Sequence, residues 1–135
     1  MPGTRPSFSS PPDLLTPPGY SHVVEIPAGR LVWTAGQVAL DADGALPTDA
    51  GWDGQTRLAF ANVGRALEAA GAGWRDVVKL TIYVVDVSAL PTIRAVRDEH
   101  VDTTSPPTSS LVQVAGLLRS DLLIEVEAVA WLPAG

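Results

Sequence analysis

The sequence predicts a single α+β domain in which a mixed sheet of five or six strands carries two helices on one face. Three observations predict it: short runs rich in β-branched residues, two segments with apolar residues at helical spacing, and a length of 135 residues. A domain of about 150 residues buries roughly 70% of the surface of its unfolded chain, which leaves room for one core. We therefore expect residues 19–135 to form one domain after a proline-rich N-terminal arm over residues 1–18.

The arm holds six of the twelve prolines of the chain. Because proline lacks a backbone N–H, the arm cannot sustain a helix or a central strand, and we expect it to be extended or disordered. It offers few apolar side chains, so residues 1–16 should contribute little to stability. It lacks a charged segment followed by an apolar one, so we do not expect a secretory signal.

Two β-rich runs follow, at residues 22–26 and 30–35. Pro27, Ala28 and Gly29 separate them, which predicts a hairpin. Residues 41–44 (Asp-Ala-Asp-Gly) begin like a calcium-binding loop but lack its later ligands, so a β-turn is favoured.

Residues 53–71 carry apolar side chains at helical spacing, which predicts the first helix. The side chains of residues 77–85 alternate in character, which predicts a strand with one buried face. We expect that face to consist of Val78, Leu80, Ile82 and Val84. Ser88 as N-cap and Pro91 in the first turn predict a second helix, with Arg97 on the same side as its apolar residues.

Two further strands, at residues 109–114 and 122–131, complete the sheet. Two helices cover only one face of a sheet of this size. The other face needs a cover, and another subunit is the simplest one. Charged residues make up 18% of the chain, where roughly 25% is usual, which agrees with a surface that is partly buried between copies.

Composition argues against several classes of function. The chain has no cysteine, and its two histidines, His22 and His100, are far apart in sequence, so we expect no metal site. No glycine-rich loop precedes a helix, so we expect no nucleotide or other cofactor. The net charge of −6 repels phosphate groups, which makes nucleic acids and membranes unexpected partners. No apolar run approaches the about 20 residues that span a membrane, and we expect a cytoplasmic protein.

Glu125 is the most informative acid, because it interrupts an apolar strand. A carboxylate there is paired, hydrated or facing a cavity, and in a cleft it would suit the activation of water. Alternatively, Glu125 simply faces water on an exposed face of the sheet. Arg94 and Arg97 have the same alternative, in which they simply face water on an exposed side of the second helix. Tyr20 is either a loop anchor or the wall of a pocket. No G-x-S-x-G turn presents a nucleophilic serine.

Five separated motifs resemble those of the YjgF/RidA family and follow one another in its order over residues 17–132. They are P-G-Y-S-H (18–22), A-G-Q-V (35–38), D-V-V-K (76–79), P-T-S-S-L-V-Q-V (107–114) and I-E-V-E-A-V-A (124–130). The resemblance implies a chorismate-mutase-like fold, three copies packed into a central barrel, and small-molecule pockets between subunits. It also implies hydrolysis of reactive enamines and imines, such as 2-aminoacrylate, to keto acids and ammonia.

Position by position, the resemblance implies that Glu125 positions the attacking water. The arginine with which family members clamp the substrate carboxylate falls on Ser109, and the serine of their S-G-Q motif falls on Ala35. Arg94 lies near a helix position where many relatives have an asparagine. The substrate-binding residues expected from the resemblance are Tyr20, Ala35, Gly36, Arg94, Ser109 and Leu111.

Loss of the clamp arginine removes a charged hydrogen bond worth about 1.5–3 kcal/mol. Either the substrate lacks a carboxylate or Arg94 supplies a displaced charge. Two functions stay open: an enamine or imine deaminase, and a non-catalytic protein that binds a small ligand or serves as an interaction module. A ribonuclease or translation inhibitor is disfavoured by the acidic charge and the lack of a histidine pair.

Overall fold

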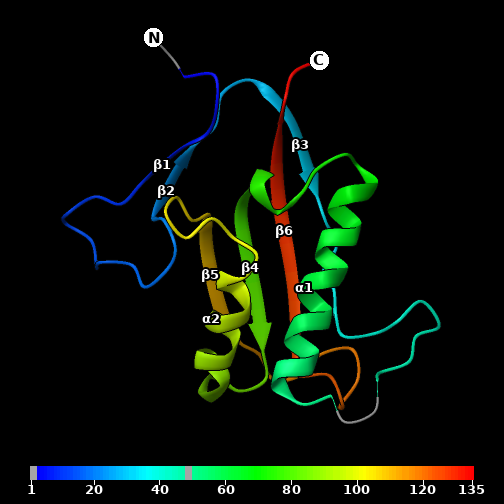
Figure 1. The fold of residues 1–135 in the computed structure, drawn as a ribbon. Coiled ribbons are helices and arrows are strands. Elements are labelled where there is room, and N and C mark those ends of the chain that lie inside the picture. Colours follow the sequence, from blue (N-terminus) through cyan, green and yellow to red (C-terminus); the bar gives the residue numbers. More distant parts are fainter. Residues whose placement is uncertain (1–2, 48–49) are drawn as a thin grey trace.

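The structure, a computed structural model, describes residues 3–47 and 50–135. Its main body has two layers, a four-stranded sheet and two helices that lie on one face of it (Figure 1). The strands follow one another across the sheet as β3 (Gly29–Trp33), β6 (Ile124–Pro133), β4 (Val77–Val84) and β5 (Thr108–Gln113). β4 and β5 are parallel and the other pairs are antiparallel, so the sheet is mixed, as the sequence predicts.

Both predicted helices are confirmed. α1 (Trp52–Ala69) buries Phe60, Val63 and Leu67 against the sheet. α2 (Leu90–Asp98) has Pro91 in its first turn, as expected. The expected cap at Ser88 is wrong: the carboxylate of Asp86 accepts a hydrogen bond from the Ser88 backbone N at 2.8 Å and caps the 3₁₀ turn that leads into α2. This hydrogen bond lowers the pKa of Asp86.

The core lies between the helices and the sheet, where alternate residues of β4 and β6 meet α1 and α2. Along β6 the alternation follows the prediction from Ile124 onward. Along β4 a β-bulge between Val77 and Lys79 shifts the register, so Val77 joins the main core in place of the predicted Val78.

The predicted hairpin between residues 22–26 and 30–35 is wrong. β2 (Val23–Glu25) pairs with β1 (Ser7–Ser9) in a separate two-stranded sheet, whereas β3 pairs with β6. The connection at residues 27–29 is held over β6, because Trp131 Nε1 donates a hydrogen bond to the Pro27 carbonyl at 3.1 Å. Gly29 permits this close approach, since a Cβ there would lie 2.2 Å from Trp131 Nε1.

The described part of the N-terminal arm is extended, as predicted, and it also forms β1, which the sequence did not indicate. Pro6 and Phe8 of the arm border one small cavity together with Val78 and Trp131. Val78 and Trp131 are only 4% and 3% exposed. Residues 6–8 therefore lie against the domain, whereas residues 9–16 of the arm are exposed.

The predicted turn at residues 41–44 is confirmed. Gly44 N donates to the Asp41 carbonyl at 3.0 Å, and Asp41 Oδ1 accepts from the backbone N of Asp43 and Ala45, each at 2.9 Å. The Asp41 carboxylate therefore stabilises the turn that contains it.

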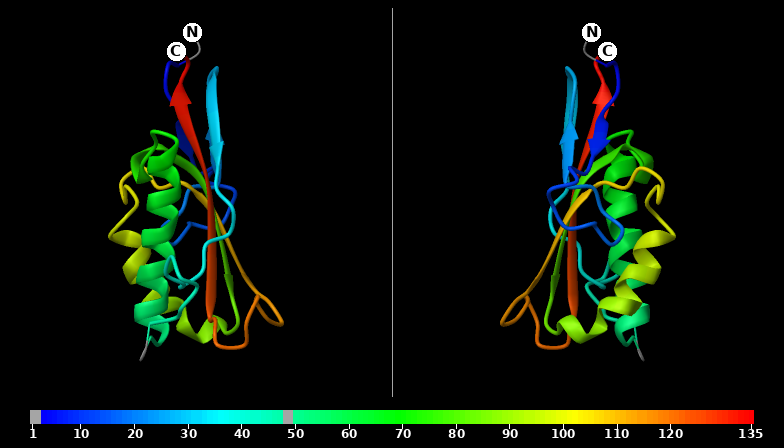
Figure 2. Two further views of the ribbon diagram at one scale, coloured as in Figure 1. Left: turned by 90° about the vertical axis from the view of Figure 1, so that its right-hand side faces the viewer. Right: turned by 90° about the vertical axis from the view of Figure 1, so that its left-hand side faces the viewer.

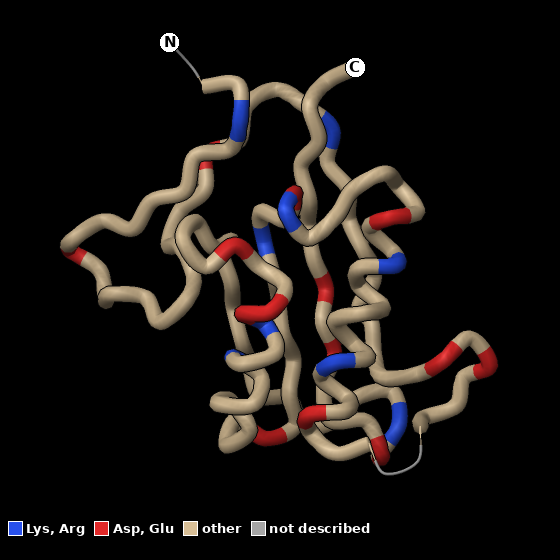
Figure 3. The backbone as a smooth tube through the Cα atoms, in the orientation of Figure 1, with Lys and Arg blue, Asp and Glu red and all other residues tan. Residues whose placement is uncertain are grey.

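The second face of the four-stranded sheet carries none of the described helices (Figure 2). Trp33 is 68% exposed there, and Leu31 and Val112 are also exposed. Basic positions are scattered among acidic ones along the described chain rather than gathered in a stripe (Figure 3). None of the helices in the described ranges is both long enough and apolar enough to cross a membrane.

Candidate functional site

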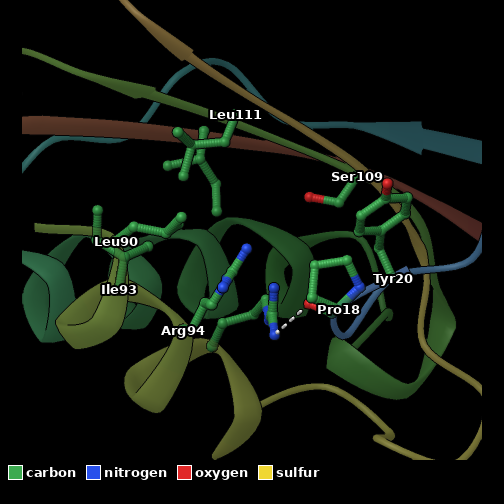
Figure 4. A pocket seen from close by; sticks show the side chains of 9 residues that line it. Pro18, Tyr20, Leu90, Ile93, Arg94, Ser109 and Leu111 are labelled. Atoms are coloured by element: carbon green, nitrogen blue, oxygen red, sulfur yellow. Dashed lines mark hydrogen bonds between the residues drawn. The ribbon is translucent and has the colours of Figure 1, made fainter. Parts of the chain in front are cut away.

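A cavity of about 300 Å³ lies between α2, β5 and the end of the N-terminal arm (Figure 4). This volume is at the lower end of the range for small-molecule sites. We call it the α2 pocket, and it is lined by Pro18, Tyr20, Ile82, Leu90, Ile93, Arg94, Arg97, Ser109 and Leu111. Four of the residues expected from the sequence thus lie together: Tyr20, Arg94, Ser109 and Leu111.

Strand register explains the wall formed by β5. Ser109 pairs with Leu80 and Leu111 pairs with Ile82, and both partners face the helices. Because side chains alternate along a strand, Ser109 and Leu111 point toward α2. On α2 itself, Leu90, Arg94 and Arg97 are spaced by four and three residues and lie on one side of the helix.

Ser21 attaches the loop before β2 to the start of β5. Its backbone N donates to the Pro107 carbonyl at 3.1 Å, and its hydroxyl donates to the Pro106 carbonyl at 2.6 Å. Tyr20 is thereby held at the pocket, where its ring meets His22 edge-on at 5.2 Å between centroids. Tyr20 is a wall of the pocket, which decides between the two sequence interpretations of this residue.

Arg97 is a buried basic residue of the α2 pocket, with a side chain only 9% exposed. Its Nε and Nη2 lie 2.9 Å from Asp98 Oδ1, and Nη2 donates to the Pro18 carbonyl at 3.5 Å. A solvated helical face is therefore the wrong interpretation for Arg97, and the expected site lacked this residue. The signal was present in the sequence, because Arg97 shares a side of the helix with Leu90 and Ile93.

Arg94 is half-buried and points into the same cavity (Figure 4). Within residues 3–47 and 50–135, its guanidinium makes no hydrogen bond or ion pair. The α2 pocket thus combines two guanidinium groups, the Ser109 hydroxyl and several aliphatic side chains. Such a lining can bind an anion that carries an apolar group.

Glu125 lies on the opposite face of the sheet, where it pairs with Tyr83 across β6 and β4. Its carboxylate lies against the backbone of Gly36, since a Cβ on Gly36 would be 2.4 Å from Glu125 Oε2. Two backbone hydrogen bonds between Gln37 and Val126, of 2.7 and 2.9 Å, hold the Gly36 segment beside β6. Glu125, Gly36 and the exposed Ala35 therefore form a second group, which the sheet separates from the α2 pocket within one chain.

Tyr83 and Glu127 are neighbours of Glu125 that the sequence did not single out. The Tyr83 hydroxyl donates a hydrogen bond to the Glu127 carboxylate. This bond raises the pKa of Tyr83 above its ordinary value of 10.0, and burial and the charges of Glu127 and Glu125 act in the same direction. Of the two acids on this strand face, Glu127 accepts the hydrogen bond from Tyr83, whereas Glu125 accepts no hydrogen bond from the described residues.

Comparison with known proteins gives consistent matches. Residues 13–132 match the family described as Endoribonuclease L-PSP. The 2-iminobutanoate/2-iminopropanoate deaminase of Salmonella typhimurium is 36% identical over 114 residues, which cover 81% of this chain and 85% of that protein.

Two solved structures show the same fold. A conserved Rid family protein of unknown function from Yersinia pestis, YyfB, superposes with a TM-score of 0.82 at 36% identity, over 95% of this chain and 99% of that one. Escherichia coli TdcF with bound serine gives a TM-score of 0.67 at 34% identity, over 79% of this chain and 84% of that one.

Proposed function

This chain belongs to the YjgF/RidA family, also described as Endoribonuclease L-PSP, and we propose that it hydrolyses a reactive imine or enamine to a carbonyl product and ammonia. The family resemblance and the chorismate-mutase-like fold expected from the sequence are confirmed. The observation that carries the proposal is the position of Glu125, whose carboxylate lies against Gly36 on the sheet face that carries none of the described helices.

The chemistry requires water and a proton acceptor. Glu125 accepts a proton from a water molecule while the water oxygen bonds to the carbon of the C=N group, and it passes this proton to the nitrogen to give a carbinolamine. Glu125 then accepts the hydroxyl proton of the carbinolamine and delivers it to the amino nitrogen, so that the C–N bond breaks and ammonia leaves as the carbonyl forms. A carboxylate suits both steps, because in each one it takes a proton from oxygen and returns it to nitrogen.

The site is proposed to lie between subunits of a homotrimer. Glu125 and the α2 pocket are on opposite faces of one sheet, so a single chain does not bring them together. In a closed ring of three, each contact joins two different surfaces. The partner subunit's Glu125 then faces the α2 pocket of its neighbour, and the exposed Trp33 and Val112 are covered.

Measurement of ammonia release tests this function. The substrates are a panel of imines generated in the assay from amino acids and amines, including 2-aminoacrylate. We expect turnover above the rate in buffer, and loss of that turnover in Glu125→Gln, which keeps the shape but accepts no proton. Glu68→Gln, on the exposed side of α1, is the matched control and should keep full activity. Turnover that survives Glu125→Gln contradicts the assignment.

A non-catalytic ligand-binding protein is the alternative that remains, and it predicts ligand binding without ammonia release. The ribonuclease activity in the family description finds less support. His22 bonds the Leu15 carbonyl at 2.6 Å, whereas His100 packs against Phe60 and Trp74 with ring centroids 5.2 and 5.4 Å away. The two histidines therefore do not form an acid–base pair, and the net charge of −6 disfavours RNA.

A further inference from the structure

We propose that Arg94 and Arg97 together bind the carboxylate of an aliphatic imino-acid substrate. The inference rests on the proposed function and names the groups that hold its substrate. It also moves the anion-binding group from β5, where the sequence has Ser109, to α2.

Arg97 is fixed in place before any ligand arrives. Asp98 and the Pro18 carbonyl hold its Nε and Nη2. The backbone of Gly19 lies against the same guanidinium. Its Nη1 makes no hydrogen bond to the described residues and is available to a ligand in the pocket. A donor that is already ordered loses little entropy on binding.

Arg94 supplies the second charge. Arg94 is a half-buried residue that lines the same cavity, and its guanidinium has no partner within the described ranges. Asp98 is bonded to Arg97 alone, so the two guanidinium groups leave a net positive charge at the cavity. An anion relieves this repulsion and gains charge-assisted hydrogen bonds, which a neutral ligand does not.

The other side chains that line the α2 pocket indicate which chemical groups the rest of the ligand carries. Ile82, Leu90, Ile93 and Leu111 form an aliphatic surface, and Ile82 and Ile93 are almost completely buried. The Ser109 hydroxyl stands beside this surface and can hydrogen-bond the imine nitrogen or one carboxylate oxygen (Figure 4). In the described part of the chain, the lining contains no carboxylate or amide side chain to receive a polar substituent. An aliphatic imino acid matches this lining.

Binding of stable analogues to the full chain tests the inference by isothermal titration calorimetry. The probes are 2-oxopentanoate, 2-pentanone, which lacks the carboxylate, and pyruvate, which has the shorter side chain. We expect 2-oxopentanoate to bind at least about tenfold more tightly than 2-pentanone, since one charged hydrogen bond accounts for such a factor. Pyruvate should also bind more weakly than 2-oxopentanoate.

Arg94→Gln and Arg97→Gln should each weaken 2-oxopentanoate binding by about tenfold or more. Arg75→Gln, at an arginine whose side chain is 84% exposed, is the matched control and should bind like the wild type. If Arg97→Gln lowers the Tm strongly, Arg94→Gln decides alone, because Arg94 has no partner within the described residues to lose.

Equal affinity for 2-oxopentanoate and 2-pentanone, or an unchanged Kd in Arg94→Gln, overturns the inference. Ammonia release from neutral imines together with no binding of the keto acid also overturns it, while the proposed hydrolysis stands. Carboxylate-selective binding lost in Arg94→Gln, without ammonia release from any imine, supports the arginine pair and contradicts the hydrolysis. The two ideas therefore fail separately.

Discussion

Gly19 lies directly against the guanidinium of Arg97, so that a Cβ on Gly19 would be 2.1 Å from Arg97 Nη2. Gly19 also has a φ of +93°, in the left-handed region that favours glycine. Gly19→Ala should therefore strain the backbone, displace Arg97 from the α2 pocket and weaken 2-oxopentanoate binding. The strain lowers the free energy of unfolding by about 1–3 kcal/mol, which chemical denaturation measures.

Gly44→Ala is the matched control for this substitution. Gly44 has a φ of +78° and no atom within 4 Å of the position that a Cβ would occupy, so the change adds backbone strain alone. We expect Gly44→Ala to leave ligand binding intact. Equal ligand affinity in Gly19→Ala and Gly44→Ala would show that the Gly19 contact does not position Arg97.

Gly36 and Glu125 allow a parallel test on the other face of the sheet. A Cβ on Gly36 would lie 2.4 Å from Glu125 Oε2, at the end of a flexible side chain that can swing away. Gly36→Ala should therefore lower kcat for ammonia release by about tenfold or more, because the proton acceptor moves, while the Tm stays near that of the wild type. Gly116→Ala, with open space at its Cβ position, should keep its activity. A normal kcat in Gly36→Ala would mean that this contact does not set the position of Glu125.

Much of the main body could be predicted from the sequence, because α1, β4, α2 and β6 have regular apolar spacing that local patterns reveal. The pairing of β2 could not. A hairpin signal specifies only a neighbour in sequence, whereas β1 offered β2 a partner from the proline-rich arm and Trp131 held the connection over β6. The β-bulge that places Val77 instead of Val78 in the main core likewise depends on the pairing of β4 with its partner strand β6.

The family motifs led to Tyr20 and Ser109 of the α2 pocket, whereas Glu125 lies on the opposite face of the sheet. Arg97 was left out of the expected site although it shares the apolar side of its helix, because a charged residue on a short helix usually faces solvent. Its burial depends on Gly19 and Pro18, which lie far from it in sequence and are brought over α2 by the hydrogen bonds of Ser21. The Tyr83–Glu127 hydrogen bond likewise depends on the register of β4 against β6.

The exposed sheet face predicts the effect of a charge at its centre. Trp33→Glu places a carboxylate on a surface that the proposed trimer buries, so the variant should sediment as a single chain of 14.1 kDa. The wild type should sediment at three times that mass. Val87→Glu, at another exposed apolar residue just before α2, should remain trimeric. A wild type that stays monomeric at micromolar concentration would remove both the assembly and the shared site.

Tyr83 provides a pH-dependent test. Its pKa is raised above 10.0, chiefly by the hydrogen bond to Glu127, so the folded state favours the neutral phenol. The stabilising contribution is complete below the unfolded value of 10.0 and is lost as the pH rises through the folded pKa. The stability of the wild type relative to Tyr83→Phe should therefore fall as the pH rises through the folded pKa of Tyr83.

Phenolate absorbance measures this pKa directly. The chain has two tyrosines, so Tyr83→Phe leaves only Tyr20, and subtraction isolates the titration of Tyr83. A midpoint at or below that of free tyrosine would contradict the hydrogen bond to Glu127.

The proposed site uses Arg94 of one subunit and Glu125 of the next, and mixed trimers test this most directly. At substrate concentrations below KM, Glu125→Gln chains are expected to have lost ammonia release from an aliphatic imino acid, and Arg94→Gln chains to keep about a tenth of it or less. When the two are co-expressed in equal amounts and purified together, about a quarter of the interfaces in a ring of three pair an intact Arg94 with an intact Glu125. We predict that the mixture recovers about that share of wild-type activity. Mixed trimers no more active than the average of the two parents would contradict a site shared between subunits.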